Sequence, residues 1–214
     1  GSITMLKDLT IKQFCDEVDS ASPAPGGGSV AALVATLGIS LTRMYAHLSI
    51  GKKRFLALDE TTQLAFIEIF EQLKPLHTQL LEAVDKDSNA YNNVMKAIRM
   101  PKETEAEILL RNKAMDEANH IAIKTPYEVM ELAYQAMKPL ASLIPYGNKN
   151  AISDIGVGIL LLDTALQGAA YNVRINLSSL KEDERIQWDH KMKDLLIKSN
   201  ELKNSLLLEI DQYM

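Results

Sequence analysis

The sequence has a single cysteine, Cys15, among its 214 residues, and only 6% of its residues are aromatic. One cysteine cannot form an intramolecular disulfide, which fits a reducing compartment. No histidine lies near Cys15, so we expect a small buried residue rather than a nucleophile. The histidines His47, His77, His120 and His190 are scattered without metal-ligand spacing, and no cofactor-binding signature is visible. We therefore expect no metal and no cofactor.

The chain also lacks an excess of positive charge and a long hydrophobic run. Its 23 Lys and Arg are outnumbered by 28 Asp and Glu, so the net charge is −5 and general nucleic-acid binding is not expected. The longest uncharged apolar run, residues 30–42, is shorter than the roughly 20 residues that span a bilayer, and no secretory signal is recognisable. We expect a cytoplasmic protein that binds neither nucleic acid nor a membrane.

Helix-forming residues dominate between two glycine-rich clusters, and we find no linker. Residues 1–4 look like a cloning scar, and residues 5–214 are predicted to form a single helical domain. Apolar residues recur at helical spacing over most of this length. They predict helices over residues 10–21, 29–44, 59–100, 103–124, 126–143, 153–180 and 183–213. Residues 155–162 could be a strand by composition, but no long stretch alternates with period two.

The ends of these helices follow from capping residues and prolines. Ser29 is predicted to cap the second helix, and Ser153 or Asp154 to cap the sixth. Pro75 is expected to kink or split the third helix, and Pro126 to open a new one. Long helices with short connections predict an all-α fold, a bundle of mostly antiparallel helices. Two helices carry wide apolar or small-residue faces, so we expect dimerisation through helix faces, or a higher homo-oligomer.

Two candidate sites combine glycine or positive charge with a helix end. Gly26, Gly27 and Gly28 precede Ser29, so a ligand can approach the backbone and the free amides of a helix N-terminus suit an anion. A flexible turn explains the same residues. Residues 51–54, which include Lys52 and Lys53, are the densest positive charge in the chain and could bind an anion, or could be a solvated loop.

Two further candidates combine carboxylates with amides. Asp85 and Asp87 point about 200° apart on a helix, so only one of them can face a pocket. A buried carboxylate beside Tyr91 could act as an acid or base, although a solvated helix face is the alternative. Residues 147–154 gather amides, a lysine and a carboxylate at a helix start. Asn172 and Asn176 share one helix face with small residues, which is also typical of a polar network between helices.

Together these segments resemble one family, the cyclodeaminase/cyclohydrolase domain of folate metabolism. The matching stretches are residues 23–32 (PAPGGGSVAA), 85–91 (DKDSNAY), 147–154 (GNKNAISD) and 168–177 (GAAYNVRINL). Their order and spacing fit from about Leu6 over nearly the whole chain. The resemblance implies an all-α dimer with a folate site in a groove near the dimer contact.

The resemblance also implies a reduced folate substrate and one of two reactions. A cyclodeaminase, a lyase, converts 5-formiminotetrahydrofolate to 5,10-methenyltetrahydrofolate and ammonia. A cyclohydrolase, a hydrolase, adds water to the methenyl carbon and forms 10-formyltetrahydrofolate. Neither needs a metal or redox cofactor. A third possibility, from a different class, is a helical folate-binding or scaffold module without turnover.

Residue roles follow as hypotheses. Asp87 or Asp85, together with Asp154, moves protons at the tetrahedral carbon. Lys52, Lys53 or Lys149, with the amides after Gly28, holds the anionic glutamate tail of the substrate. The further substrate-binding candidates are Gly26, Gly27, Ser29, Tyr91, Asn148, Asn150, Ser153, Asn172 and Asn176. All these residues are expected to converge on one crevice.

Overall fold

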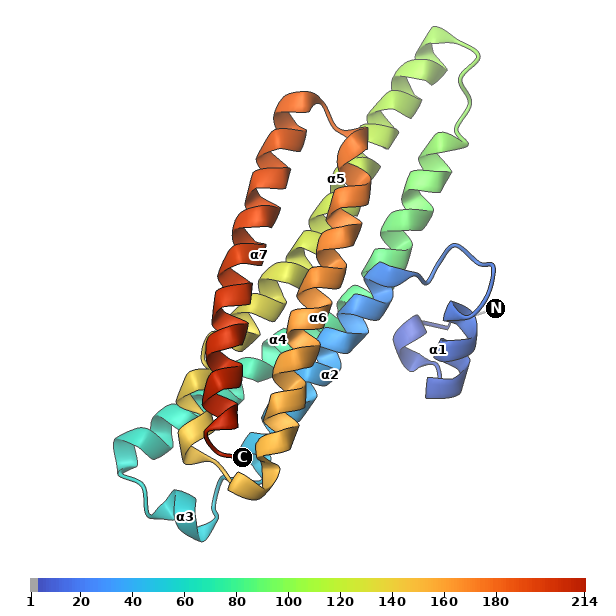
Figure 1. The fold of residues 1–214 in the computed structure, drawn as a ribbon. Coiled ribbons are helices and arrows are strands. Elements are labelled where there is room, and N and C mark those ends of the chain that lie inside the picture. Colours follow the sequence, from blue (N-terminus) through green and yellow to red (C-terminus); the bar gives the residue numbers. More distant parts are fainter. Residues whose placement is uncertain (1–3) are drawn as a thin grey trace.

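The chain is described by a computed structural model that covers residues 4–214, and this part is helical throughout, without a strand (Figure 1). The all-α prediction is confirmed. Residues 1–3 of the predicted cloning scar lie outside the described residues. The α-helices are α1 (Ile11–Val18), α2 (Gly27–His47), α3 (Lys53–Leu56), α4 (Glu60–Ile98), α5 (Glu105–Met137), α6 (Ile152–Asn176) and α7 (Glu182–Asp211). Short 3-10 helices cover Leu6–Asp8, Leu140–Ser142, Ile144–Tyr146, Lys149–Ala151 and Leu177–Ser179.

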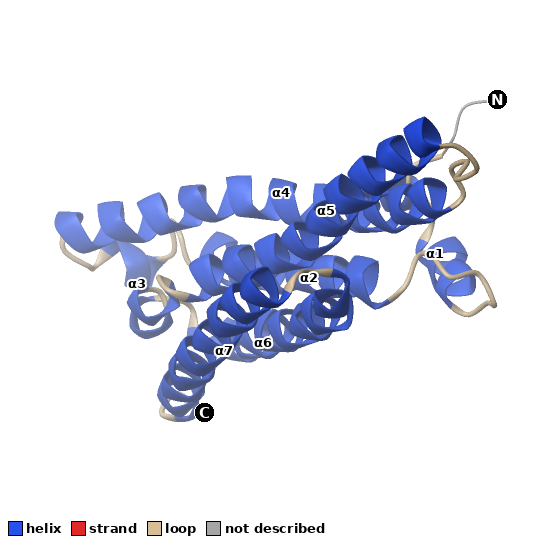
Figure 2. Cartoon of the chain, turned by 90° about the horizontal axis from the view of Figure 1, so that it is seen from above, coloured by secondary structure: helices blue, strands red, loops and turns tan. Residues whose placement is uncertain are grey.

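Four long helices, α2, α4, α5 and α6, form the bundle, and α7 packs outside α5 and α6. Helices α2 and α6 lie side by side on one side of the bundle, with α4 and α5 behind them (Figures 1 and 2). Helix α2 is much shorter than α4 and α5, which continue past its N-terminus in Figure 1. The N-terminal end of α2 therefore lies against the sides of the longer helices α4 and α5.

Helices α2 and α6 are antiparallel and unusually close. A Cβ atom built on Gly38 would lie 2.9 Å from Leu162 Cγ and 3.0 Å from the Gly158 carbonyl oxygen. At the other end of the pair, a Cβ on Gly27 would lie 3.5 Å from Asn172 Nδ2. The small residues noted in the sequence thus allow this contact, and the adjoining core is aliphatic, with Ile39, Ile155 and Leu166 fully buried.

Local capping explains where several helices begin. The Thr10 side chain caps α1 and forms a capping box with Gln13, and Thr104 does the same for α5 with Glu107. Asp59 accepts the Thr62 amide at the start of α4. The predicted starts at Thr10 and near Asp59 are therefore confirmed, whereas α1 ends at Val18, before the predicted Ala21.

The predicted caps of α2 and α6 are wrong. Helix α2 already begins at Gly27, and the buried Ser29 hydroxyl donates to the Val84 carbonyl at 2.6 Å instead. Helix α6 begins at Ile152 without a side-chain cap, and Ser153 and Asp154 lie in its first turn. Both helices therefore begin before their predicted caps, and in α2 the Ser29 hydroxyl is used in a contact with α4 that the local sequence cannot specify.

The prolines did not break the helices as predicted. Pro75 lies inside the continuous α4, so the split is wrong, and Pro126 lies inside α5 rather than opening a new helix. A proline removes one backbone hydrogen bond, and burial on the core can offset that loss, as it does for Pro126. Residues 155–162 are helical, so the strand alternative is wrong. The expectation that Cys15 is buried is also wrong, because it is exposed on α1.

Two helical segments are long and apolar enough to cross a membrane by length and composition, Gly27–His47 and Lys149–Ser179. In each segment, 56% of the most apolar 18-residue stretch is buried in the bundle, where α2 packs against α6. The core helices of a bundle share this composition with membrane spans. The predicted absence of a membrane partner stays a prediction.

Candidate functional site

A cavity of about 350 Å³ lies at the N-terminus of α2 and is called here the Asp87 cavity. The loop before α2 forms one wall, and α4, α5 and α6 form the others. The lining residues are Pro23, Ala24, Gly26, Gly27, Gly28, Asp87, Ala90, Tyr91, Val94, Ala122, Asn172, Ile175 and Asn176. Of the sequence-predicted site residues, this cavity brings together the three glycines, Asp87, Tyr91, Asn172 and Asn176.

The first turn of α2 presents backbone to this cavity. Gly26 is the N-cap residue and has no side chain, so the first amides of the helix receive no side-chain cap. Free amides and the positive end of the helix dipole favour a negatively charged or electron-rich group. The Asp87 carboxylate occupies this position. A Cβ atom on Gly28 would overlap that carboxylate, so only glycine leaves room for it.

Asp87 is half-buried, and its environment changes its acidity. Burial raises the pKa of the Asp87 carboxyl, while the Ser29 backbone amide acts in the opposite direction. A carboxyl group whose pKa is raised towards neutrality can both accept and return a proton. Asp87 is thus chemically suited to the acid–base role predicted for it.

Asn172 and Asn176 border the cavity from α6. Asn172 Nδ2 donates to the Gly168 carbonyl at 3.1 Å, and Asn176 Nδ2 donates to the Asn172 carbonyl at 2.8 Å. Asn176 Nδ2 also reaches the Ala122 carbonyl of α5 at 3.3 Å. Within residues 4–214, neither side-chain oxygen accepts a hydrogen bond. The predicted polar network therefore exists, and it leaves two acceptors for a ligand N–H.

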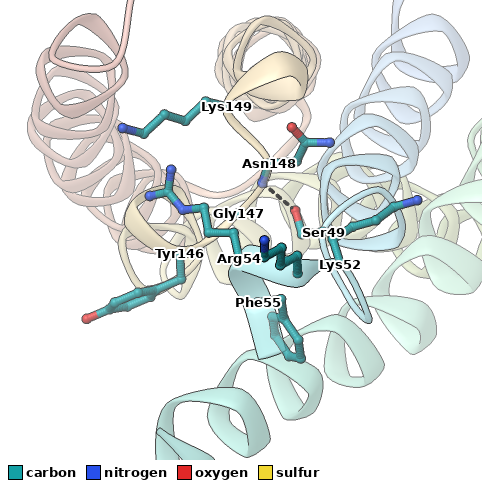
Figure 3. Close-up of a pocket in the computed structure, with 9 residues that line it drawn as sticks. Ser49, Lys52, Arg54, Phe55, Tyr146, Gly147, Asn148 and Lys149 are labelled. Carbon is teal, nitrogen blue, oxygen red and sulfur yellow. Dashed lines mark hydrogen bonds between the residues drawn. The ribbon is translucent and has the colours of Figure 1, made fainter. Parts of the chain in front are cut away.

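A second cavity, of about 330 Å³, lies at the opposite end of α2 and is called here the cationic cavity (Figure 3). Its walls are the loop after α2, α3 and the turns before α6. The lining residues are Ser49, Lys52, Lys53, Arg54, Phe55, Tyr146, Gly147, Asn148 and Lys149. It brings together Lys52, Lys53, Asn148 and Lys149, as the anion-site hypothesis requires.

Hydrogen bonds between distant segments build the cationic cavity. The Asn148 backbone amide donates to Ser49 Oγ at 2.8 Å, and Arg54 Nη2 donates to the Pro145 carbonyl at 3.0 Å. Among the described residues, the four cations of this cavity make no ion pair with a carboxylate within 4.0 Å. In Figure 3 the Lys52 side chain extends on the α2 side, away from Arg54 and Lys149. The cavity therefore holds positive charge without a counter-ion.

The two cavities are separate within one chain. The 21 residues of α2 lie between them, which corresponds to about 31 Å of helix. The prediction that all candidate residues converge on one crevice is thus wrong for a single protomer. Lys52, Lys53 and Lys149 cannot hold a ligand group beside Asp87 of the same chain.

Other candidates lie outside both cavities. The Asp85 carboxylate accepts the backbone amides of Leu6 at 2.6 Å and Lys7 at 3.2 Å, so it anchors the N-terminal segment. Asp154 is in the first turn of α6, about 27 Å along the helix from Asn172. Asp85 and Asp154 therefore do not share a site with Asp87 in this chain, contrary to the predicted pairing.

Three predicted binding residues also lie elsewhere. Ser29 is buried under the Asp87 cavity, where its hydroxyl lies 3.0 Å from that of Ser88. Asn150 is exposed, and its backbone amide donates to Asn148 Oδ1 at 3.0 Å. Ser153 is exposed on the first turn of α6. The structure gives Ser29 and Asn150 structural roles in place of direct contact with either cavity.

Comparison with known proteins adds a family. A family model described as formiminotransferase-cyclodeaminase matches residues 10–195, most of the chain. The chain belongs to this family. The matched span contains both cavities, and the resemblance noted in the sequence is confirmed.

Relatives in the formiminotransferase-cyclodeaminase family differ in length. The formimidoyltransferase-cyclodeaminase of Rattus norvegicus is 35% identical over 186 residues, which is 86% of this chain and 33% of that protein. This chain thus spans about a third of the length of that relative. The methenyltetrahydrofolate cyclohydrolase of Methylorubrum extorquens is 31% identical over 191 residues, 89% of both chains. A crystal structure of formiminotetrahydrofolate cyclodeaminase from Thermotoga maritima shares the fold, with a TM-score of 0.78, 24% identity and coverage of 97% and 96%.

Sequence reasoning missed the apolar walls of the Asp87 cavity and some of the residues that line the cationic cavity. Ala90 and Val94 follow Asp87 at spacings of three and seven residues on α4, a helical periodicity that could have identified them. Ala122 and Ile175 carried no signal, because only the packing of α5 and α6 brings them to the cavity. Within residues 4–214 no group of three His, Cys, Asp or Glu could hold a metal ion.

Proposed function

We propose that this chain is a folate one-carbon enzyme that converts 5-formiminotetrahydrofolate to 5,10-methenyltetrahydrofolate and ammonia. Its family membership and its similarity to proteins named formimidoyltransferase-cyclodeaminase support this reaction. The observation that carries the proposal is Asp87, a half-buried carboxylate with a raised pKa in a cavity at a glycine-lined helix N-terminus.

Asp87 would move one proton through the reaction. N10 of the substrate attacks the carbon of the protonated formimino group, and the Asp87 carboxylate takes the proton that N10 loses. The tetrahedral carbon then carries N5, N10 and an amino group. The protonated Asp87 returns its proton to that amino group, the carbon–nitrogen bond breaks, and ammonia leaves the methenyl product. A raised pKa helps because the carboxyl group must hold the proton between the two steps.

A second candidate is the cyclohydrolase reaction, favoured by the relative from Methylorubrum extorquens, which matches along 89% of both chains. Here Asp87 would take a proton from the water that adds to the methenyl carbon. It would return a proton to N5 as the bond between N5 and the carbon breaks, and the new hydroxyl group would release its proton to water, which leaves 10-formyltetrahydrofolate. Neither reaction changes an oxidation state, so the proposal needs no redox cofactor. The cytoplasmic location stays a prediction.

Absorbance of the methenyl compound distinguishes the candidates. Appearance of this absorbance from the formimino substrate, with ammonia released, is expected for a cyclodeaminase. Its disappearance from added methenyltetrahydrofolate would support the cyclohydrolase. If neither changes while a reduced folate still binds, the chain is a binding module and the enzymatic proposal is wrong.

The variant Asp87→Asn tests the role of the carboxylate. Turnover should fall about 10²–10⁴-fold, as is typical when a positioned acid–base group is lost. Because burial raises the pKa of Asp87, keeping this carboxyl ionised costs stability at pH values above its ordinary pKa. The variant should therefore melt at an equal or higher temperature than the parent at pH 7. The exposed Asp183→Asn is the matched control and should keep full activity.

A further inference from the structure

A groove along α4 adjoins the Asp87 cavity and is called here the α4 groove. It has a volume of about 330 Å³. The residues that line it are Pro23, Tyr91, Asn92, Met95, Lys96 and Arg99. Pro23 and Tyr91 also line the Asp87 cavity, so the two spaces meet at these residues. A ligand bound at Asp87 can therefore extend into the α4 groove.

Most of the α4 groove lies on a single helix face. The four residues spaced at i, i+3, i+4 and i+7, the pattern of one face of a helix, are Asn92, Met95, Lys96 and Arg99. This part of α4 continues past the N-terminus of α2 in Figure 1. The groove therefore leads away from α2, along the part of α4 that follows Asp87.

The α4 groove is positively charged. Lys96 and Arg99 are the charged residues that line it. The surrounding residues 88–102 contain three cations and no Asp or Glu, in a chain with a net charge of −5. Within residues 4–214, neither Lys96 nor Arg99 forms an ion pair with a carboxylate within 4.0 Å. Both cations are thus available to an anionic group of a ligand.

A third space beside the Asp87 cavity has the opposite charge. It has a volume of about 260 Å³ and also borders Pro23, and the charged residues that line it are Glu17 and Asp85. These carboxylates would repel a negatively charged part of a ligand, whereas the cations of the α4 groove would attract it. The distribution of charge therefore favours one direction, along α4, for an anionic chain that leaves the Asp87 cavity.

The dimensions of a folate fit this direction. Lys96 lies nine residues beyond Asp87 and Arg99 lies twelve, which is about 14 Å and 18 Å along the helix. In a folate, an aromatic ring and an amide place the first glutamate about 8 Å from N10 by standard bond lengths. The carboxylates of that glutamate and the long Lys96 side chain can cover the remaining distance. Tyr91, one turn beyond Asp87, lies where the aromatic ring would pass and can stack on it.

We propose that the α4 groove binds the glutamate tail of the substrate, and that Lys96 and Arg99 determine the affinity for this tail. Lys96 binds a carboxylate of the first glutamate. Arg99 binds a carboxylate of a second, γ-linked glutamate through two N–H groups of its planar guanidinium. The tail then lies at the opposite end of α2 from Lys52 and Lys149 of the same chain. The identity of the ligand rests on the proposed function.

Two stable ligands test the subsite without turnover. 5-Formyltetrahydrofolate carries one glutamate, and 5-formyltetrahydropteroate is the same compound without it. In calorimetric titrations the parent should bind the glutamate compound about tenfold more tightly, as expected for a hydrogen bond to a charged group. The variant Lys96→Gln/Arg99→Gln should lose this preference and keep the parental affinity for the pteroate. An equal loss of affinity for both compounds would overturn the proposal.

A matched control removes the same charge elsewhere on α4. Lys74 and Lys86 are exposed and line none of the cavities described above. Lys74→Gln/Lys86→Gln should therefore keep the tenfold preference for the glutamate compound. If the control loses the preference as fully as Lys96→Gln/Arg99→Gln does, net charge rather than the α4 groove attracts the tail, and the proposal is wrong.

The length of the tail separates the roles of the two cations. The triglutamate form of 5-formyltetrahydrofolate should bind the parent about threefold or more tighter than the monoglutamate, because it brings a further carboxylate to Arg99. Arg99→Gln should abolish this gain and keep most of the affinity for the monoglutamate. A gain that persists in Arg99→Gln would refute the assignment of the second glutamate to this residue.

Two results distinguish this proposal from the proposed function. A parent that turns over a folate, yet binds the pteroate as tightly as the glutamate compound, would overturn the tail subsite and leave the proposed reaction intact. A parent that shows the preference for the glutamate compound and turns over neither folate would contradict the reaction. In that case the α4 groove would still be the tail subsite of a folate-binding module.

Discussion

At the scale of single residues, the Asp87 cavity depends on the close fit of Gly28 and Asp87. The carboxylate lies where the Cβ atom of any other residue at position 28 would be. This contact keeps the group beside the first amides of α2 and away from bulk water, which raises its pKa. One glycine therefore determines both the place and the acidity of the proposed proton carrier.

Replacing Gly28 should lower the activity of the protein without preventing its folding. Gly28→Ala forces the Asp87 side chain out of its position, so we expect turnover to fall about 10²-fold, as when an acid–base group is misplaced. Gly156→Ala is the matched control, because its Cβ would meet Ile210 Cγ2 at an ordinary 3.5 Å. The control should keep activity and gain about 0.5–1 kcal/mol of stability in the helix. Full activity in Gly28→Ala would contradict the role of Asp87.

At the scale of helices, polar pairs fix α7 to the bundle. Asp163 of α6 is buried and lies 3.5 Å from Lys203 Nζ, while Gln167 Nε2 donates to the same oxygen at 3.0 Å. The other oxygen, Oδ1, is buried and finds no partner among the described residues. Closer to the start of α7, Glu184 meets His120 of α5 at 2.8 Å. These contacts orient α7 more than they stabilise it.

The Asp163 pair predicts an asymmetry between single and double variants. Asp163→Leu leaves the largely buried Lys203 ammonium without its partner and should cost about 3 kcal/mol. Asp163→Leu/Lys203→Met removes both charges and should be within about 1 kcal/mol of the parent, or more stable. Urea denaturation measures both. Equal losses in the two proteins would show that the ion pair itself is stabilising.

The His120 pair predicts a pH-dependent stability. The Asp116 carbonyl and then the Glu184 carboxylate raise the pKa of His120. A raised pKa in the folded state stabilises the protein fully below the unfolded value of about 6.5, and the contribution is lost as pH rises through the folded pKa. His120→Gln should therefore melt about 1–2 °C lower at pH 5.5 and like the parent at pH 9. A constant difference across this range would refute the link.

At the scale of the whole molecule, charge is segregated along the bundle. The chain has a net charge of −5, yet four cations gather around one cavity where no carboxylate of residues 4–214 forms an ion pair with them. The cationic cavity lies at the C-terminal end of α2, and the Asp87 cavity lies at its N-terminal end. The two ends of α2 therefore differ in charge, with the Asp87 carboxyl at one end and four cations at the other.

An increase in ionic strength should weaken substrate binding and leave the rate of the chemical step nearly unchanged. Because cationic side chains would attract the anionic glutamate tail of a folate, KM should rise as salt increases from about 0.05 to 0.5 M, where screening becomes strong. The kcat should change little, since Asp87 acts in a partly dehydrated cavity. Steady-state kinetics in a series of salt concentrations measures both constants. A KM that does not change with salt would argue against a cationic contribution to binding.

Local residue patterns were sufficient to predict the helical class, several helix starts and part of the site. Helical periodicity and capping residues such as Thr10 and Asp59 act within a few residues, so they can be interpreted locally. The glycines before α2 and the polar residues Asp87, Tyr91 and Asn172 were identified as candidates and do line one cavity. Their residue types indicate chemistry even before their positions are known.

Which of the candidate residues meet depends on the packing of helices that are distant in the sequence. The antiparallel contact of α2 with α6 carries Lys52 and Lys149 to one end of the bundle and Asp87 with Asn172 to the other. Likewise, burial lets α5 continue through Pro126, and a distant carbonyl takes the Ser29 hydroxyl away from its cap. Such outcomes depend on contacts between segments tens of residues apart, and local residue patterns do not contain them.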